Sequence, residues 1–108
     1  MQKVVYIAGA ITNNPNYKEN FDVAEQYLER QGYIILNPSK LPQGLKNEDY
    51  MRICFAMIDV ADVVAFIPGW IKSHGASLEH NYCEYVGKEI MLLDEAVPYL
   101  WWKGANDE

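Results

Sequence analysis

The sequence predicts an α/β protein: a single domain, residues 1–108, in which a parallel sheet of four to five strands carries helices on both faces. Three observations predict this fold class. Short apolar runs alternate with longer segments in which apolar residues recur at helical spacing. The run from Val4 to Ala8 is apolar throughout apart from the tyrosine, as expected of a strand buried on both faces. Parallel neighbours need crossover connections, which the helical segments supply.

Four short apolar runs are predicted strands. The first ends at Gly9, which opens a loop that continues to Pro15, and the second ends at the dipeptide Asn37-Pro38. The third predicted strand begins at Asp62, and the fourth is the last element in the alternation of strands and helices. The predicted strands span residues 4–8, 33–36, 62–67 and 90–93.

Three longer segments are predicted helices, spanning residues 16–31, 48–60 and 76–86. The first is followed by Gly32 at the position of a carboxyl-terminal cap. The residues expected to face inward in the first two helices are Tyr17, Phe21, Ala24 and Leu28, then Met51, Cys54, Phe55 and Ile58. In the third, the expected apolar stripe is Leu78, Tyr82 and either Tyr85 or Val86. The long polar segment from Ser39 to Asn47 is a predicted loop of the length that often carries function.

The charge and composition of the chain argue against some classes of binding partner. Nine basic and fifteen acidic residues give a net charge of −6, and the basic residues are scattered. We therefore expect no nucleic-acid partner. The apolar runs are too short to cross a membrane, and no signal peptide is evident, so we expect a cytoplasmic protein. The cysteines, Cys54 and Cys83, lack CxxC spacing and are expected to be reduced thiols.

An aromatic cluster lies near the end of the chain, at Tyr99, Leu100, Trp101 and Trp102. It is too apolar for a free tail, so it either forms a fifth strand or docks on another subunit. We expect a homo-oligomer in which a neighbouring subunit completes the site.

The candidate site lies where the loops that follow the strands meet, since ligands of open parallel sheets bind beyond the carboxyl ends of the strands. The junction from Pro68 to Glu79 is the most informative of these loops. Gly69 and Gly75 permit a tight turn, and the first helical N–H groups point at a ligand. Glu79 follows in the opening turns, where the macrodipole favours an ionised carboxylate that can act as nucleophile or base. An ordinary glutamate that supports only its own helix is the alternative.

Other chemistries are disfavoured by spacing. No GxGxxG follows the first strand, so dinucleotide binding by that motif is not expected. His80 neighbours Glu79 in sequence and points away from it on a helix, so His74, Glu79, His80 and Glu84 are not expected to hold a metal. Ser73 and Ser77 lack the GxSxG elbow of a serine nucleophile. We predict no cofactor and no metal.

Six short motifs follow one another along the chain: Tyr6-Ile7-Ala8-Gly9, Asn20-Phe21, Gly32-Tyr33, Asn37-Pro38, Ala61-Asp62 and Ser73-x-Gly75-x-x-x-Glu79. In this order they resemble the nucleoside 2-deoxyribosyltransferase superfamily over nearly the whole chain. The sequence of residues 68–76 is similar to that of a small branch of this superfamily that is common in bacteriophage genomes. This branch also resembles the deoxynucleoside 5′-monophosphate N-glycosidases. The resemblance implies a flavodoxin-like or Rossmann-like sheet and a nucleoside or nucleotide substrate.

The resemblance also implies roles for individual residues. Glu79 matches the family's nucleophile, which attacks C1′ of a deoxyribonucleoside and releases the base, and Tyr6 and Asp62 are the other predicted catalytic residues. The residues expected to shape the substrate pocket are Gly9, Ala10, Asn37, Cys54, Gly69, Trp70, Ser73 and Gly75.

Two departures from the family pattern leave an alternative open. Cys54 stands where relatives carry an aspartate, and a thiol of ordinary pKa is a poor general acid. Ala10 and Thr12 stand where the monophosphate hydrolases have serine and arginine. The alternatives are a binding protein that sequesters a nucleotide or nucleotide-derived signal without turnover, and a purely structural or interaction module.

Overall fold

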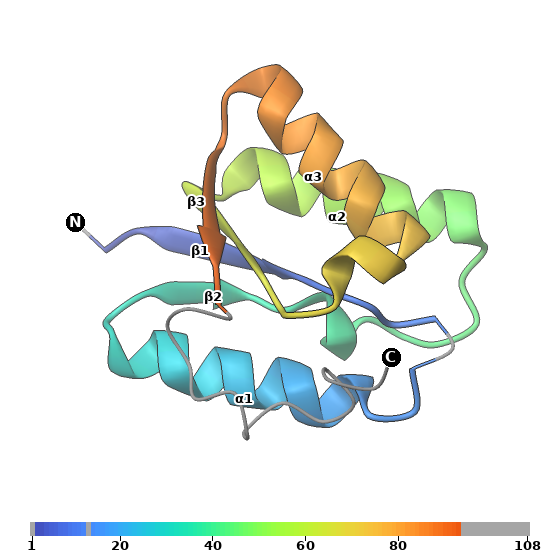
Figure 1. Ribbon diagram of the computed structural model, residues 1–108, viewed down its shortest axis with the longest axis horizontal. Coiled ribbons are helices and arrows are strands. Elements are labelled where there is room, and N and C mark those ends of the chain that lie inside the picture. The colour runs from blue at the N-terminus through green and yellow to red at the C-terminus, as the bar shows by residue number, and fades with distance from the viewer. Residues whose placement is uncertain (1, 13, 94–108) are drawn as a thin grey trace.

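A four-stranded parallel sheet forms the centre of the protein (Figure 1). The computed structural model describes residues 2–12 and 14–93. The strands lie in the order β2-β1-β3-β4, and every neighbouring pair is parallel. Their bounds are β1 Val4–Ala8, β2 Ile34–Leu36, β3 Val63–Phe66 and β4 Glu89–Leu92. The predicted α/β fold class is confirmed, whereas the residues of the predicted aromatic cluster, 99–102, lie outside the described part of the chain.

Helices cover both faces of this sheet, as the strand-helix alternation predicts (Figure 1). Helix α1 (Tyr17–Arg30) packs on one face, and helices α2 (Asn47–Val60) and α3 (His74–Val86) pack on the other. The observed bounds differ from the predicted ones by at most two residues at each end. Two 3₁₀ turns, Pro38–Lys40 and Trp70–Lys72, add short regular structure to the predicted loops.

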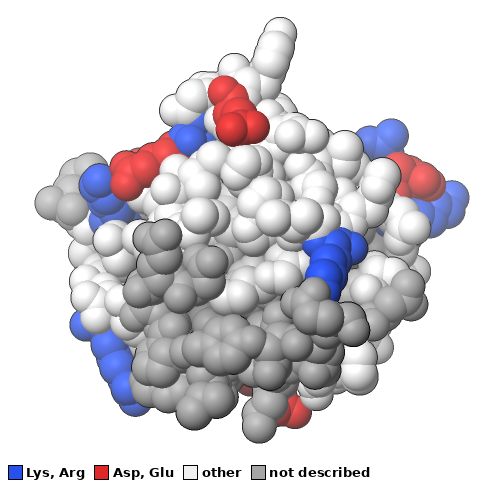
Figure 2. Space-filling model, viewed as in Figure 1, with Lys and Arg blue, Asp and Glu red and all other residues white. Residues whose placement is uncertain are grey.

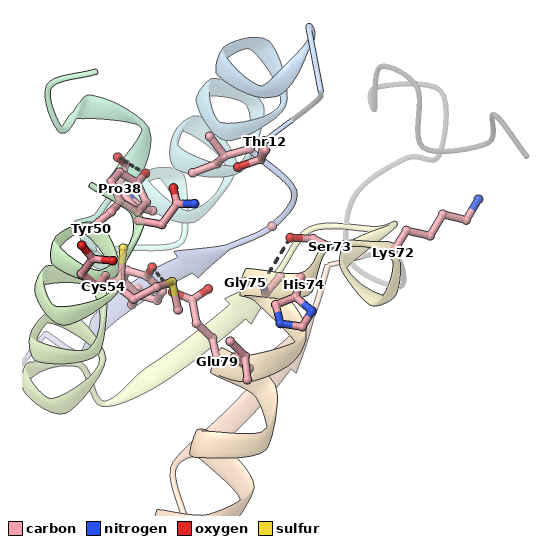
Figure 3. A pocket seen from close by; sticks show the side chains of 17 residues that line it. Thr12, Pro38, Tyr50, Cys54, Lys72, Ser73, His74, Gly75 and Glu79 are labelled. Carbon is pink, nitrogen blue, oxygen red and sulfur yellow. Dashed lines mark hydrogen bonds between the residues drawn. The ribbon is translucent and has the colours of Figure 1, made fainter. Parts of the chain in front are cut away.

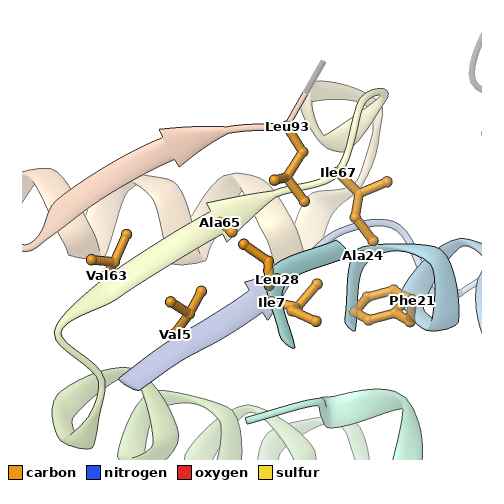
Figure 4. Close-up of a cluster of buried hydrophobic side chains, with 9 residues drawn as sticks. All are labelled: Val5, Ile7, Phe21, Ala24, Leu28, Val63, Ala65, Ile67 and Leu93. Carbon is orange, nitrogen blue, oxygen red and sulfur yellow. The ribbon is translucent and has the colours of Figure 1, made fainter. Parts of the chain in front are cut away.

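A cluster of apolar side chains fills the core between α1 and the sheet (Figure 4), and Asn20 is the buried polar residue of α1. Alternate strand residues point toward it, because successive side chains of a strand face opposite sides of a sheet. Its members are Val5, Ile7, Phe21, Ala24, Leu28, Val63, Ala65, Ile67 and Leu93. This cluster ties α1 to the three strands β1, β3 and β4 and their immediate ends.

The core on the opposite face of the sheet contains ionisable side chains, a tyrosine and two cysteines, among its apolar residues. The intervening strand residues point this way, and the two cysteines of α2 and α3 meet them. Its members are Tyr6, Ala8, Cys54, Ile58, Ala61, Val64, Phe66 and Cys83. The side chain of Glu79 is also buried, at 5% exposed.

The buried face of α3 differs from the predicted one. Ala76, Glu79 and Cys83 face inward, whereas Leu78 is 43% and Tyr85 is 91% exposed. Both sets satisfy helical spacing, so periodicity alone does not choose between them. The inward set has two small side chains, which let α3 approach the sheet closely while Glu79 reaches the end of β1.

Charged side chains are dispersed over the face shown in Figure 2. The Lys and Arg side chains visible there stand apart from one another, and Asp or Glu side chains lie beside several of them. Within residues 2–12 and 14–93, no helix has the length and apolar character required to cross a bilayer.

Candidate active site

A cavity of about 510 Å³ opens where the loops after β1, β2 and β3 meet the amino-terminal parts of α2 and α3 (Figure 3). This is the carboxyl edge of the sheet, where ligands of parallel α/β proteins bind. The cavity is lined by Tyr6, Gly9, Ile11, Thr12, Pro38, Asn47, Glu48, Tyr50, Met51, Cys54, Lys72, Ser73, His74, Gly75, Ala76, Leu78 and Glu79.

Glu79 and Tyr6 form the polar centre of this cavity. Tyr6 is a buried residue, 1% exposed, and its hydroxyl donates a hydrogen bond of 2.6 Å to Glu79 Oε2. Burial raises the pKa of Glu79 to about 7, and the hydrogen bond from Tyr6 acts in the opposite direction. The helix macrodipole, expected from the sequence to favour the ionised carboxylate, does not set the pKa of Glu79. Glu79 is the sixth residue of α3, and the influence of the dipole is concentrated in the first turn.

Cys54 stands on α2 against the same pair. Burial raises the pKa of its thiol to about 11, partly offset by hydrogen bonding with Tyr6. Burial is likewise the main reason that the pKa of Tyr6 is well above its ordinary value, with Glu79 and Cys54 adding to it. The three groups therefore include one side chain, Glu79, that changes charge near neutral pH.

The amino terminus of α3 forms the opposite wall. Ser73 caps the helix, its Oγ accepting a hydrogen bond of 3.2 Å from the Ala76 N–H. The backbone N–H groups of His74 and Gly75 are among those that a helix does not use internally, and both residues line the cavity. A Cβ at Gly75 would meet Met51 Sδ at 3.7 Å, an ordinary contact, so packing does not require glycine there. Its small size instead leaves room for a ligand to approach the backbone.

Residues 3–92 match a protein family described as a domain of unknown function (DUF4406). The chain belongs to this family. A comparison with curated proteins found no match. Among solved structures, the 2-deoxyribosyltransferase of the psychrotolerant bacterium Bacillus psychrosaccharolyticus superposes with a TM-score of 0.67 at 22% sequence identity. The superposition covers 82% of this chain and 70% of that one. The DUF4406 chain thus has the Rossmann-like architecture of a 2-deoxyribosyltransferase, as the resemblance implies.

The structure brings six of the predicted site residues together around the cavity: Tyr6, Gly9, Cys54, Ser73, Gly75 and Glu79. Gly9 is required by a close approach, because a Cβ there would lie 3.0 Å from the Cβ of Ile67.

Asp62, a predicted catalytic residue, does not line the cavity and is not part of this group. It precedes β3 and so lies at the amino edge of the sheet, opposite the cavity. There its Oδ2 accepts a hydrogen bond of 2.8 Å from the Val4 N–H, while its own N–H donates to the Val4 carbonyl at 2.7 Å. Asp62 joins the starts of β1 and β3.

Four further predicted pocket residues lie away from the cavity wall. Asn37 caps the 3₁₀ turn by accepting from Ser39 and donates to Glu25. The Ala10 carbonyl accepts a hydrogen bond of 3.2 Å from the side-chain amide of Asn14. Gly69 supplies the left-handed turn (φ 90°) after β3. The Trp70 ring stacks on His80 with centroids 4.3 Å apart, because the turn that follows Gly69 folds it onto α3.

Several lining residues were missed by sequence reasoning. Tyr50 and Glu48, on the first turns of α2, and Lys72 and His74 beside Ser73 all reach the cavity. The length of the 39–47 loop was the available signal for the α2 residues. Within the described residues, no cluster of three or more His, Cys, Asp or Glu side chains has the geometry to hold a metal ion.

Proposed function

We propose that this protein is a nucleoside 2-deoxyribosyltransferase-like enzyme that cleaves or transfers the N-glycosidic bond of a deoxynucleoside or nucleotide. The observation that carries the proposal is the buried Glu79 carboxyl, held by the Tyr6 hydroxyl at 2.6 Å inside a 510 Å³ cavity. A cavity of that size is typical of small-molecule sites. The structural neighbour described as a 2-deoxyribosyltransferase supports the same chemistry.

In this chemistry, one oxygen of ionised Glu79 attacks C1′ as the bond from C1′ to the base nitrogen breaks. The bond electrons leave with the base, which takes a proton from water. The anion stabilises the positive charge that develops at C1′, and the product is a glycosyl ester of Glu79. Attack on C1′ by water then gives hydrolysis, and attack by the nitrogen of a second base gives transfer. In each case the attacking group loses a proton to the hydroxide left by the first step, and the C1′–O bond of the ester breaks to regenerate the carboxylate.

Tyr6 has a positioning role in this proposal. Its hydrogen bond fixes the carboxylate in one orientation and favours the ionised form, which burial opposes. Ser73 and the N–H groups of His74 and Gly75 offer polar contacts to the rest of the substrate.

The test is incubation with a panel of deoxynucleosides and their 5′-monophosphates, followed by chromatography for released base. Glu79→Gln, which keeps the shape of the side chain, should reduce base release at least about 1000-fold while ligand binding persists. Glu84→Gln is the matched control, since Glu84 is exposed on the same helix and outside the cavity. Equal turnover in Glu79→Gln and the wild type would refute the proposal.

A second candidate function, a protein that binds a nucleotide or nucleotide-derived signal without turnover, is favoured by Cys54. A buried thiol with a pKa of about 11 is a weak proton donor to a departing base. Cys54→Asp should increase base release if the protein is an enzyme limited by this step. Tight binding in the wild type, with no base release by wild type or Cys54→Asp, supports the binding role.

The remaining predictions concern assembly and origin. We propose a homo-oligomeric, cytoplasmic protein of the phage-associated branch. Light scattering of the full chain at micromolar concentration tests the oligomer, and a monomer would contradict it.

A further inference from the structure

A second cavity of about 280 Å³ adjoins the first. The two share Ile11, Thr12, Asn47 and Tyr50 as lining residues, so they are two lobes of one cleft separated by these side chains. In Figure 3, Thr12, Pro38 and Tyr50 lie across the first lobe from Ser73 and Gly75. The second lobe therefore extends the cleft away from the start of α3.

Tyr50 marks the boundary between the lobes. Its hydroxyl donates a hydrogen bond of 3.0 Å to the Pro38 carbonyl, which fixes the ring between α2 and the end of β2. Burial raises the pKa of Tyr50, and so do the nearby groups Cys54 and Glu79 of the first lobe and Tyr17 of the second.

The two lobes differ in charge. The first contains Glu48, Lys72, His74 and Glu79. The second contains no ionisable side chain other than tyrosine among its described lining residues: Ile11, Thr12, Tyr17, Ser39, Leu41, Pro42, Gln43, Gly44, Leu45, Asn47 and Tyr50. It combines two phenol rings with amide, hydroxyl and apolar side chains, and Gln43 Nε2 donates a hydrogen bond of 2.9 Å to the Tyr17 hydroxyl.

This mixture suits a neutral, planar group with hydrogen-bonding edges. Aromatic rings stack on such a group, and amides pair with its donors and acceptors. A nucleobase has these properties, whereas a phosphate or carboxylate would find no cation among the described residues of this lobe. The first lobe alone already has the volume of a complete small-molecule site. The second lobe is therefore additional space rather than part of a mononucleoside pocket.

Building on the proposed glycosyl chemistry at Glu79, we infer that the preferred ligand has two parts, a nucleotide in the first lobe joined to a second nucleobase-bearing unit whose base occupies the second lobe. A dinucleotide has this chemistry. The sugar and base beside Glu79 are the reacting part, and the second base supplies affinity away from the bond that breaks.

Calorimetry with deoxyadenosine 5′-monophosphate and with a two-adenine deoxydinucleotide tests the inference. We expect the dinucleotide to bind the wild type at least about tenfold more tightly. Leu45→Trp fills the second lobe from a half-exposed loop position outside the first lobe and should remove this advantage while leaving monophosphate binding unchanged. Gln43→Trp is a second filling variant, and Gln26→Trp, exposed on α1, is the control. Thermal unfolding checks that each variant is folded.

The outcomes separate this inference from the proposed function. Equal affinity for the two ligands, or equal weakening of both by Leu45→Trp and Gln43→Trp, overturns the two-part ligand even if monophosphate is cleaved. A dinucleotide advantage that the filling variants remove supports it even if no base is released, in which case only the proposed catalysis fails. Absence of binding by either ligand overturns the two-part ligand, whereas the proposed catalysis is decided separately by base release from the panel of deoxynucleosides.

Discussion

The two faces of the sheet are built from alternate residues of the same strands, yet they differ in chemistry. On the α1 side, Val5 and Ile7 of β1 pack in an apolar cluster with Phe21, Ala24 and Leu28 of the helix. On the α2 and α3 side, Tyr6 lies between these residues in sequence but contacts Glu79 and the Cys54 thiol. A one-residue step along β1 therefore separates a face that stabilises the fold from a face that holds ionisable groups.

The comparison shows that, in the described part of the chain, unfavourable burial of an ionisable group is confined to one face of the sheet, the face that holds Glu79. A buried carboxyl costs free energy unless it is neutral or hydrogen-bonded; Glu79 has a pKa of about 7 and accepts a hydrogen bond from Tyr6. Buried groups with shifted pKa values concentrate at functional sites. The α1 face, free of such groups among the described residues, can supply the stability that the opposite face lacks.

The largest expected effect on stability comes from the α1 face. Leu28 is fully buried among Val5, Phe21 and their neighbours (Figure 4). Leu28→Ala should lower the free energy of unfolding by about 2–5 kcal/mol through lost burial and a cavity. Denaturant titration measures this change. Leu92→Ala, at a position 39% exposed on β4, is the control and should cost under about 1 kcal/mol. Similar losses in the two variants would contradict the distinction.

The opposite face should make stability depend on pH. The pKa of Glu79 is about 7 in the folded protein against an ordinary 4.5, so the unfolded chain loses this proton first as pH rises. Stability contributed by the neutral carboxyl is full below about pH 4.5, falls between 4.5 and 7, and is lost above 7. The total is about 3 kcal/mol at 1.36 kcal/mol per pKa unit.

Urea unfolding of the wild type and Glu79→Gln at pH 5 and pH 8 measures this effect. The neutral amide does not titrate, so the variant should lack the Glu79 contribution and lose less stability between the two pH values. Parallel pH profiles for the two proteins would show that Glu79 titrates alike in the folded and unfolded chains.

A smaller effect should follow from removing the Tyr6 hydroxyl. Its hydrogen bond lowers the pKa of Glu79, so Tyr6→Phe should raise that pKa further. If ionised Glu79 is the nucleophile, the acid limb of the rate profile should move upward by about one to two pH units, since a hydrogen bond to a charged group contributes about 1.5–3 kcal/mol and one pKa unit is about 1.36 kcal/mol. The pH dependence of base release measures the shift. An unchanged acid limb would mean that another group controls it.

The smallest effect concerns the opposite edge of the sheet. Asp62→Ala removes the acceptor for the Val4 N–H and should cost about 0.5–1.5 kcal/mol of stability without changing base release per folded molecule. Asp62→Asn, which keeps an acceptor oxygen, should retain most of that stability. Loss of activity in folded Asp62→Ala would restore a catalytic role to this residue.

The sequence by itself determined the fold class and the order of its elements. The strand Val4–Ala8 is recognisable as a nearly continuous apolar run, and Gly32 marks the end of the preceding helix in the sequence. Both signals are readable because burial in a parallel sheet and backbone preferences at helix ends act locally. The junction that contains Ser73, Gly75 and Glu79 was predictable for the same reason, since a cap and a helix start are local features.

Only the tertiary structure decided which side chains meet. Helical spacing permitted either face of α3 to be buried, and docking on the sheet chose the one that carries Glu79 rather than Leu78. Asp62 and Cys54 are similarly placed by strand direction and helix packing: one lies at the amino edge with Val4, the other beside Tyr6. The physical reason is that these contacts join residues far apart in the chain, and their geometry depends on the whole packed assembly rather than on any local pattern.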